Sequence, residues 1–120
     1  MHAICHTSVF TRAASDSGMT DDEVDDLEDL LARNPVAGEE MVGTGGCRKL
    51  RLGGKGKGKS GGFRVVTFFT GDDLPVFLIT VFAKGDRANL TKGERNMLAK
   101  LTGVLVYEYR KKVVAAGERS

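Results

Sequence analysis

The residues best suited to chemistry lie in one basic stretch, residues 47–64, which reads CRKLRLGGKGKGKSGGFR. Two short apolar alternations flank a ribbon of glycine and lysine, a pattern that predicts a strand, a loop and a return strand. Lysines set between glycines can follow a phosphate backbone whose position is not fixed beforehand. The stretch therefore predicts a polyanion-binding site. It has no acidic residue, and its seven bases are Arg48, Lys49, Arg51, Lys55, Lys57, Lys59 and Arg64.

The alternation of side chains assigns these bases to faces of a sheet. In CRKLRL, Lys49 and Arg51 share one face, whereas Leu50 and Leu52 point to the core on the other. On the return strand, Arg64 has the same parity as the apolar residues after it, so its guanidinium lies at the rim of the sheet or faces a polar site.

Residues 53–60, GGKGKGKS, match the phosphate-binding pattern G-x-x-x-x-G-K-[ST] letter for letter. In a true P-loop the Lys and Ser open a helix whose N-terminus faces the phosphates. Here Gly61, Gly62 and a β-branched, aromatic strand follow Ser60, so no helix starts there. The match follows from alternating composition, and we expect no nucleotide cofactor.

Charge is distributed unevenly along the chain. The net charge of +2 combines a first part, residues 1–46, with two bases and ten acids (net −8), and a second part, residues 47–120, with sixteen bases and six acids (net +10). The strong positive charge of the second part is suited to binding a polyanion. At 120 residues, the chain is expected to form a single domain, residues 1–120.

Several other classes of protein are disfavoured. Two cysteines predict reduced thiols in a cytoplasmic protein rather than a disulfide scaffold, and we expect neither a secretory signal nor a membrane span. His2 and His6 would share a strand face, but further ligands for a metal are missing nearby. We expect no metal and no cofactor.

The order of elements predicts an α+β fold. We expect a strand at residues 3–10, a helical turn at 11–17 and an amphipathic helix that begins after Thr20, where Glu23 completes a capping box, and stops at Asn34-Pro35. Strands are expected at 40–42, 47–52, 63–70 and 74–83, the last two as an antiparallel hairpin. A second capping box at Thr91 opens a final helix that Gly117 would close. The result is a small sandwich with helices packed on an antiparallel sheet.

The segment GTGGCRKLRLGGKGKGKSGGFRVVTFF, followed by PVFLITVFAKGDRANLTKGERNML, resembles the RelE/HigB-type toxins of bacterial toxin-antitoxin pairs, especially the HigB-like branch. The resemblance covers about residues 34–102 and implies a RelE-like sandwich. It implies a ribosome-dependent mRNA endonuclease that cuts without metal and is inactivated by a protein antitoxin, which we expect to be a helix-turn-helix protein. Some relatives carry a Tyr near the start of the last helix, whereas this chain has only Tyr107 and Tyr109, deep in that helix.

Chemistry would have to come from lysine and arginine, because no His stands near the basic cluster. Crowded ammonium groups lower one another's pKa, so a lysine in such a cluster can accept a proton from a ribose 2′-OH. Arginine stays protonated but can hold developing charge on a phosphate with two aligned donors. We assign Arg64 to transition-state charge and Lys57 and Lys84 to proton transfer. The expected RNA-binding residues are Lys49, Arg51, Lys55, Lys59 and Arg87.

Two alternatives remain at this point. Charge alone favours a basic nucleic-acid-binding module without catalysis, because positioning contacts are commoner than catalytic ones. A gyrase-directed toxin on the same fold would also have a basic surface, since fold alone does not decide function.

Overall fold

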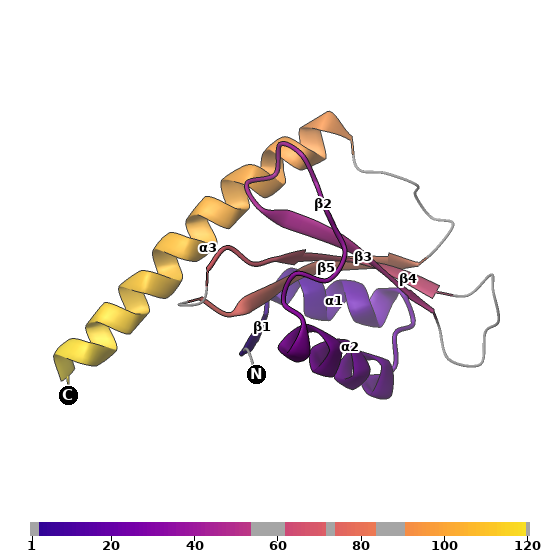
Figure 1. The fold of residues 1–120 in the computed structure, drawn as a ribbon, viewed down its shortest axis with the longest axis horizontal. Coiled ribbons are helices and arrows are strands. Elements are labelled where there is room, and N and C mark those ends of the chain that lie inside the picture. Colours follow the sequence, from indigo (N-terminus) through magenta and orange to yellow (C-terminus); the bar gives the residue numbers. More distant parts are fainter. Residues whose placement is uncertain (1–2, 54–61, 72–73, 84–90, 120) are drawn as a thin grey trace.

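A computed structural model describes residues 3–53, 62–71, 74–83 and 91–119. Its sheet has the strand order β1-β5-β4-β3-β2, with three helices packed against it (Figure 1). The pairs β5-β4, β4-β3 and β3-β2 are antiparallel, and β1 joins β5 in parallel. This arrangement confirms the α+β class and the RelE-like sandwich, but the sheet is mixed and not antiparallel throughout as expected, because β1 is parallel to β5. The elements are β1 (Ile4–His6), α1 (Ser8–Asp16), α2 (Asp21–Arg33), β2 (Glu39–Glu40), β3 (Cys47–Gly53), β4 (Gly62–Phe68), β5 (Val76–Ala83) and α3 (Lys92–Arg119).

The sheet is covered on both faces, so the molecule has two hydrophobic cores. Helices α1 and α2 pack on one face, where Phe10, Leu27 and Leu31 meet alternate residues of β4 and β5. The long helix α3 packs on the other face, where Leu98 joins a second set of alternate strand residues (Figure 1). Because successive strand residues point to opposite faces, β4 and β5 are almost continuously apolar.

Helices α2 and α3 begin at the capping boxes that the sequence predicts. At α2, the Glu23 N–H donates to Thr20 Oγ1 (3.2 Å) and the Thr20 N–H donates to Glu23 Oε1 (2.9 Å). At α3, Thr91 and Glu94 make the same two bonds, at 3.1 and 2.9 Å. Each box satisfies two backbone donors that a helix start otherwise leaves without partners.

The N-terminal prediction is wrong in part. The strand expected at residues 3–10 ends at His6, and α1 starts at Ser8 rather than near residue 11. Thr7 explains the change, because its Oγ1 accepts from the Phe10 N–H (3.1 Å) and caps α1. The same hydroxyl donates to the carbonyl of Leu78 (2.8 Å), which ties this turn to β5.

Two further boundaries differ from expectation. Gly117 does not close the last helix, since α3 continues to Arg119. The extended piece expected at residues 40–42 is the two-residue strand β2, displaced toward the N-terminus. It pairs with β3 through Glu39 opposite Lys49 and Glu40 opposite Arg48, so opposite charges meet at this edge of the sheet.

A buried hydroxyl fastens the loop before β3. Thr44 is fully buried, donates to the Met41 carbonyl (2.6 Å) and accepts from the Cys47 N–H (3.1 Å). Thr102 of α3 lies against the same loop, with its Oγ1 3.4 Å from the Thr44 carbonyl. Thr44 thereby links the start of β3 to the middle of α3.

The buried hydroxyl of Thr67 leads us to expect that its removal stabilises the fold. It is fully buried in β4, and its Oγ1 has no hydrogen-bond partner among the described residues. A buried hydroxyl without a partner costs about 1–3 kcal/mol, and valine has the same shape without the hydroxyl. Thr67→Val is therefore expected to raise the free energy of unfolding by about 1 kcal/mol in denaturant titrations. A lower free energy of unfolding would show that Thr67 has a partner in solution.

Candidate functional site

The register of β3 and β4 brings two predicted site residues face to face. Arg51 pairs directly with Arg64, and Lys49 lies two residues along β3 on the same side, opposite Val66. Since directly opposed residues have Cβ atoms about 5 Å apart, the two arginine side chains leave the sheet next to one another. The structure therefore groups Lys49, Arg51 and Arg64, and we call these three the basic row.

The basic row belongs to the sheet face that α3 covers. Val66 and Phe68 lie on the same face of β4 as Arg64 and are buried in the core beneath α3. Leu50 and Leu52 instead pack in the core beneath α1 and α2. This confirms the predicted facing of Lys49 and Arg51 away from Leu50 and Leu52. It also places Arg64 at the end of an apolar stripe, as its parity predicted.

Arg64 is the most firmly positioned of the three. It is the third of seven residues in β4, is partly buried, and has Arg51 on one side and Phe82 on the other. Phe82 is 7% exposed and packs in the core beneath α3, and it lies directly opposite Arg64 across the β4-β5 pair. A strand residue between two paired neighbours loses little freedom when it binds a ligand. Sequence parity gave no role to Phe82, because the pairing of β4 with β5 decides which residue stands beside Arg64.

The charges of the basic row favour an anion as ligand. Like charges placed directly opposite one another destabilise a strand pair, by up to about 1 kcal/mol. An anion that lies between Arg51 and Arg64 offsets that repulsion and can accept hydrogen bonds from both guanidinium groups. Arg51 is exposed at the end of β3, which leaves the row open to a ligand from solvent.

Five predicted site residues lie outside the described part of the chain: Lys55, Lys57, Lys59, Lys84 and Arg87. The described residues next to them are at the same end of the sheet as Arg51 and Arg64. Gly53 pairs with Gly62, and Ala83 pairs with Phe63. The segments that carry the five residues therefore leave the sheet beside the basic row.

Other sites considered in the sequence receive less support. The P-loop match lies mostly in residues 54–61, outside the described ranges, but the chain after it enters β4 at Gly62 and not a helix. Among the described residues, no three His, Cys, Asp or Glu side chains gather as metal ligands. His6 instead contacts a carboxylate of α2, with its Nε2 3.0 Å from Glu28 Oε1.

Cys47 is a core residue and not a nucleophile. It has no exposed surface, and burial raises the pKa of its thiol to about 11, with a smaller opposing effect from the hydrogen bond to Thr44. The reactive form of a cysteine is the thiolate, which this environment disfavours. The basic row is therefore the best candidate for chemistry in the described part of the chain.

The fold and the basic row agree with a comparison against known families. The model of a family described as the RelE toxin of the RelE / RelB toxin-antitoxin system matches residues 2–119. The chain belongs to the RelE toxin family. It is thus a toxin of a toxin-antitoxin system, and RelE toxins are generally ribonucleases that act on mRNA and are held by a cognate antitoxin. Membership in the HigB-like branch stays a prediction. None of the described helices is long and apolar enough to span a membrane.

Proposed function

We propose that this RelE toxin is a ribosome-dependent mRNA endonuclease whose cleavage site is the basic row together with the lysines that follow β3 and β5. The observation that carries the proposal is the pairing of Arg51 with Arg64 across β3 and β4. It supports the proposal because two permanently charged, two-donor side chains start next to one another on the sheet, with Lys49 beside them, so that one phosphate could accept hydrogen bonds from both arginines. The enzyme would act in the cytoplasm, where mRNA is translated.

The reaction is an attack of the ribose 2′-oxygen on the adjacent phosphorus. A neutral lysine, Lys57 or Lys84, accepts the 2′-OH proton, while the 5′-oxygen of the next nucleotide leaves and takes up a proton from the other of these two lysines, which is protonated. Arg64 stabilises the charge that grows on the non-bridging phosphate oxygens. The products are a 2′,3′-cyclic phosphate and a 5′-hydroxyl end. Each step uses lysine or arginine, so the mechanism requires no metal ion.

A defined translation assay tests this function. Purified toxin added to ribosomes programmed with a short mRNA should cut that mRNA, whereas the same mRNA without ribosomes should be cut far more slowly. A basic module without catalysis would slow translation but leave the mRNA intact. A gyrase-directed toxin would instead inhibit DNA supercoiling. Intact mRNA on stalled ribosomes would refute the proposal.

Lys55 and Lys59, unlike Lys57, are expected to act in binding rather than in the cleavage step. Each lysine that contacts a phosphate contributes about one unit to the slope of log affinity against log salt. Lys55→Gln and Lys59→Gln should each lower affinity for programmed ribosomes and reduce that slope by roughly one unit. Single-turnover cleavage at saturating ribosome should stay close to wild type. A loss of cleavage at saturation would assign these lysines to the chemical step.

A further inference from the structure

A carboxylate lies next to the basic row, on the short strand β2. Glu39 pairs directly with Lys49, and residues that pair directly across an antiparallel sheet point to the same face. Arg51 is the diagonal neighbour of Glu39, about 7–8 Å away, a distance that long side chains can span. Glu39 therefore belongs to the same surface as the basic row, although all acidic residues lie outside the basic stretch in the sequence.

The backbone on both sides of Glu39 is held against β3. Gly38 lies so close to β3 that a Cβ there would be 2.6 Å from the Lys49 carbonyl oxygen. After β2, the Met41 N–H donates to the Cys47 carbonyl (2.9 Å). The side chain of Glu39 is exposed, so a ligand from solvent meets a carboxylate whose backbone is already in place.

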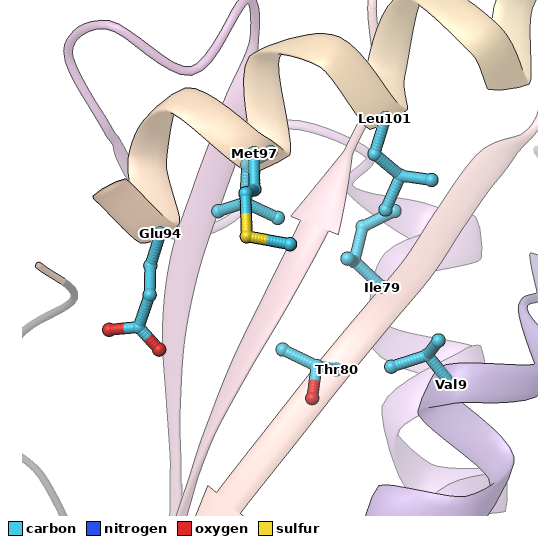
Figure 2. A pocket seen from close by; sticks show the side chains of 7 residues that line it. Val9, Ile79, Thr80, Glu94, Met97 and Leu101 are labelled. Atoms are coloured by element: carbon cyan, nitrogen blue, oxygen red, sulfur yellow. The ribbon is translucent and has the colours of Figure 1, made fainter. Parts of the chain in front are cut away.

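A phosphate held by Arg51 and Arg64 has two different surfaces beside it on this face of the sheet. Toward β5 lies an apolar groove of about 360 Å³ between α3, β5 and the start of α1 (Figure 2). Glu94, the charged residue of the groove's described lining, caps α3 and accepts from the Thr91 N–H. Toward β2 lies the exposed Glu39. Because base edges are distinguished by hydrogen bonds, the β2 side is better suited to reading a nucleobase.

The chemistry of a carboxylate determines which bases it can read. An ionised carboxylate accepts hydrogen bonds and donates none, so it pairs with the amino groups of adenine, cytosine and guanine. Such hydrogen bonds are stronger than neutral ones because the acceptor is charged. Uracil has no amino group, and the carbonyl oxygens on either side of its one N–H repel a carboxylate. Bases with an amino group are therefore favoured next to β2.

We propose that Glu39 is a specificity-determining residue that accepts a hydrogen bond from the amino group of an RNA base next to the phosphate held by Arg51 and Arg64. The inference rests on the proposed function and assigns the base preference of the same site. Lys49, directly opposite, offsets the negative charge of Glu39, so the carboxylate can lie beside the RNA backbone. The toxin then favours adenine, cytosine or guanine over uracil at this position.

A purely structural role for Glu39 makes a different prediction. If Glu39 served only as a counter-charge to Lys49, Glu39→Gln would raise the affinity for every RNA by the same factor, because one negative charge is removed. Glu40→Gln is the matched control. Glu40 is exposed on the same strand and pairs with a base in the same way, but its partner is Arg48 on the opposite face of the sheet.

Binding of short RNA oligonucleotides tests the assignment without requiring cleavage. The probes are fluorescent oligomers of adenosine, cytidine or uridine, and 2′-O-methyl groups prevent them from being cut. Wild-type toxin should bind the adenosine and cytidine probes about tenfold more tightly than the uridine probe. In Glu39→Gln this ratio should fall to about twofold or less, because an amide can also donate to uracil, whereas Glu40→Gln should keep the wild-type ratio.

Cleavage of ribosome-bound mRNAs that differ in one base gives a second reading. Wild type and Glu40→Gln should show a kcat/KM about tenfold lower when uracil occupies the position, and Glu39→Gln should lose this preference. The same base ratios in wild type and Glu39→Gln would overturn the proposal, as would an equal gain in affinity of Glu39→Gln for all three probes. If the binding ratios change as expected but wild-type toxin cuts no mRNA, the role of Glu39 stands and the proposed function fails.

Discussion

Replacing Arg64 with alanine is expected to slow single-turnover cleavage on programmed ribosomes by about a hundredfold or more, with only a modest loss of binding. Arg64 is held between Arg51 and Phe82 in the middle of the sheet, so its guanidinium can be aligned on one phosphate before the reaction. Alanine removes both donors at the point where charge develops. The measurement is the cleavage rate at saturating ribosome, separated from the affinity.

Two further variants test whether the effect of Arg64→Ala comes from the two aligned donors of the guanidinium group. Arg64→Lys should recover little activity, because an ammonium group is a point charge and cannot replace a planar group with two aligned donors. Arg48→Ala is the control on the neighbouring strand. Arg48 lies on the opposite face of β3, where its Nη1 is 3.4 Å from the Gly38 carbonyl, so its loss should leave the rate unchanged. If Arg64→Lys cuts at nearly the wild-type rate while Lys57→Gln and Lys84→Gln are inactive, Arg64 is only a phosphate contact.

A second large effect is expected at Gly38, which supports the strand that carries Lys49. Gly38 has a φ of +96°, and a Cβ there would lie 2.6 Å from the Lys49 carbonyl oxygen and 3.0 Å from its carbon. Both contacts are with backbone, so β3 itself would have to move. Gly38→Ala should lower the free energy of unfolding by about 3–4 kcal/mol, from backbone strain and the clash together.

Gly43 provides the matched control for this prediction. Its φ is +81°, but a Cβ there would meet no atom within 4 Å. Gly43→Ala should therefore show only the cost of the left-handed backbone, about 1–2 kcal/mol. The difference between the two variants in denaturant titrations measures the contact with β3. Equal losses would mean that the segment before β2 adjusts without disturbing Lys49.

Local rules predicted much of the fold. Thr20 with Glu23 and Thr91 with Glu94 marked two helix starts, because a capping box is a contact between residues three apart. Alternation along β3 correctly separated Lys49 and Arg51 from Leu50 and Leu52, since side-chain direction in a strand follows from position alone.

Features that depend on contacts between distant parts of the chain could not be predicted from local sequence patterns. The start of α1 depends on Thr7, whose hydroxyl also bonds to Leu78, 71 residues away. The parallel pairing of β1 with β5 and the shift in β5 at Ile79 likewise arise between segments far apart in the chain. The pairing of Arg51 with Arg64 needed the exact register across residues 54–61, which only the assembled sheet supplies.

The groove is a further case of this kind. Its lining combines Val9, Ile79 and Met97 from three elements, and the helical spacing that predicted α3 does not say which of its apolar residues remain exposed. Met97 is 71% exposed because α3 lies across the sheet in such a way that the next residue, Leu98, enters the core instead.

The most direct test of the account is the chemistry of the RNA ends that the toxin leaves. Programmed ribosomes carrying end-labelled mRNA are treated with wild-type toxin, and the fragments are analysed for their terminal groups. Attack by the 2′-oxygen predicts a 2′,3′-cyclic phosphate on one fragment and a 5′-hydroxyl on the other, with both absent in Arg64→Ala at the same time point. Fragments with 3′-hydroxyl and 5′-phosphate ends would contradict the account, because they require an activated water rather than the ribose hydroxyl.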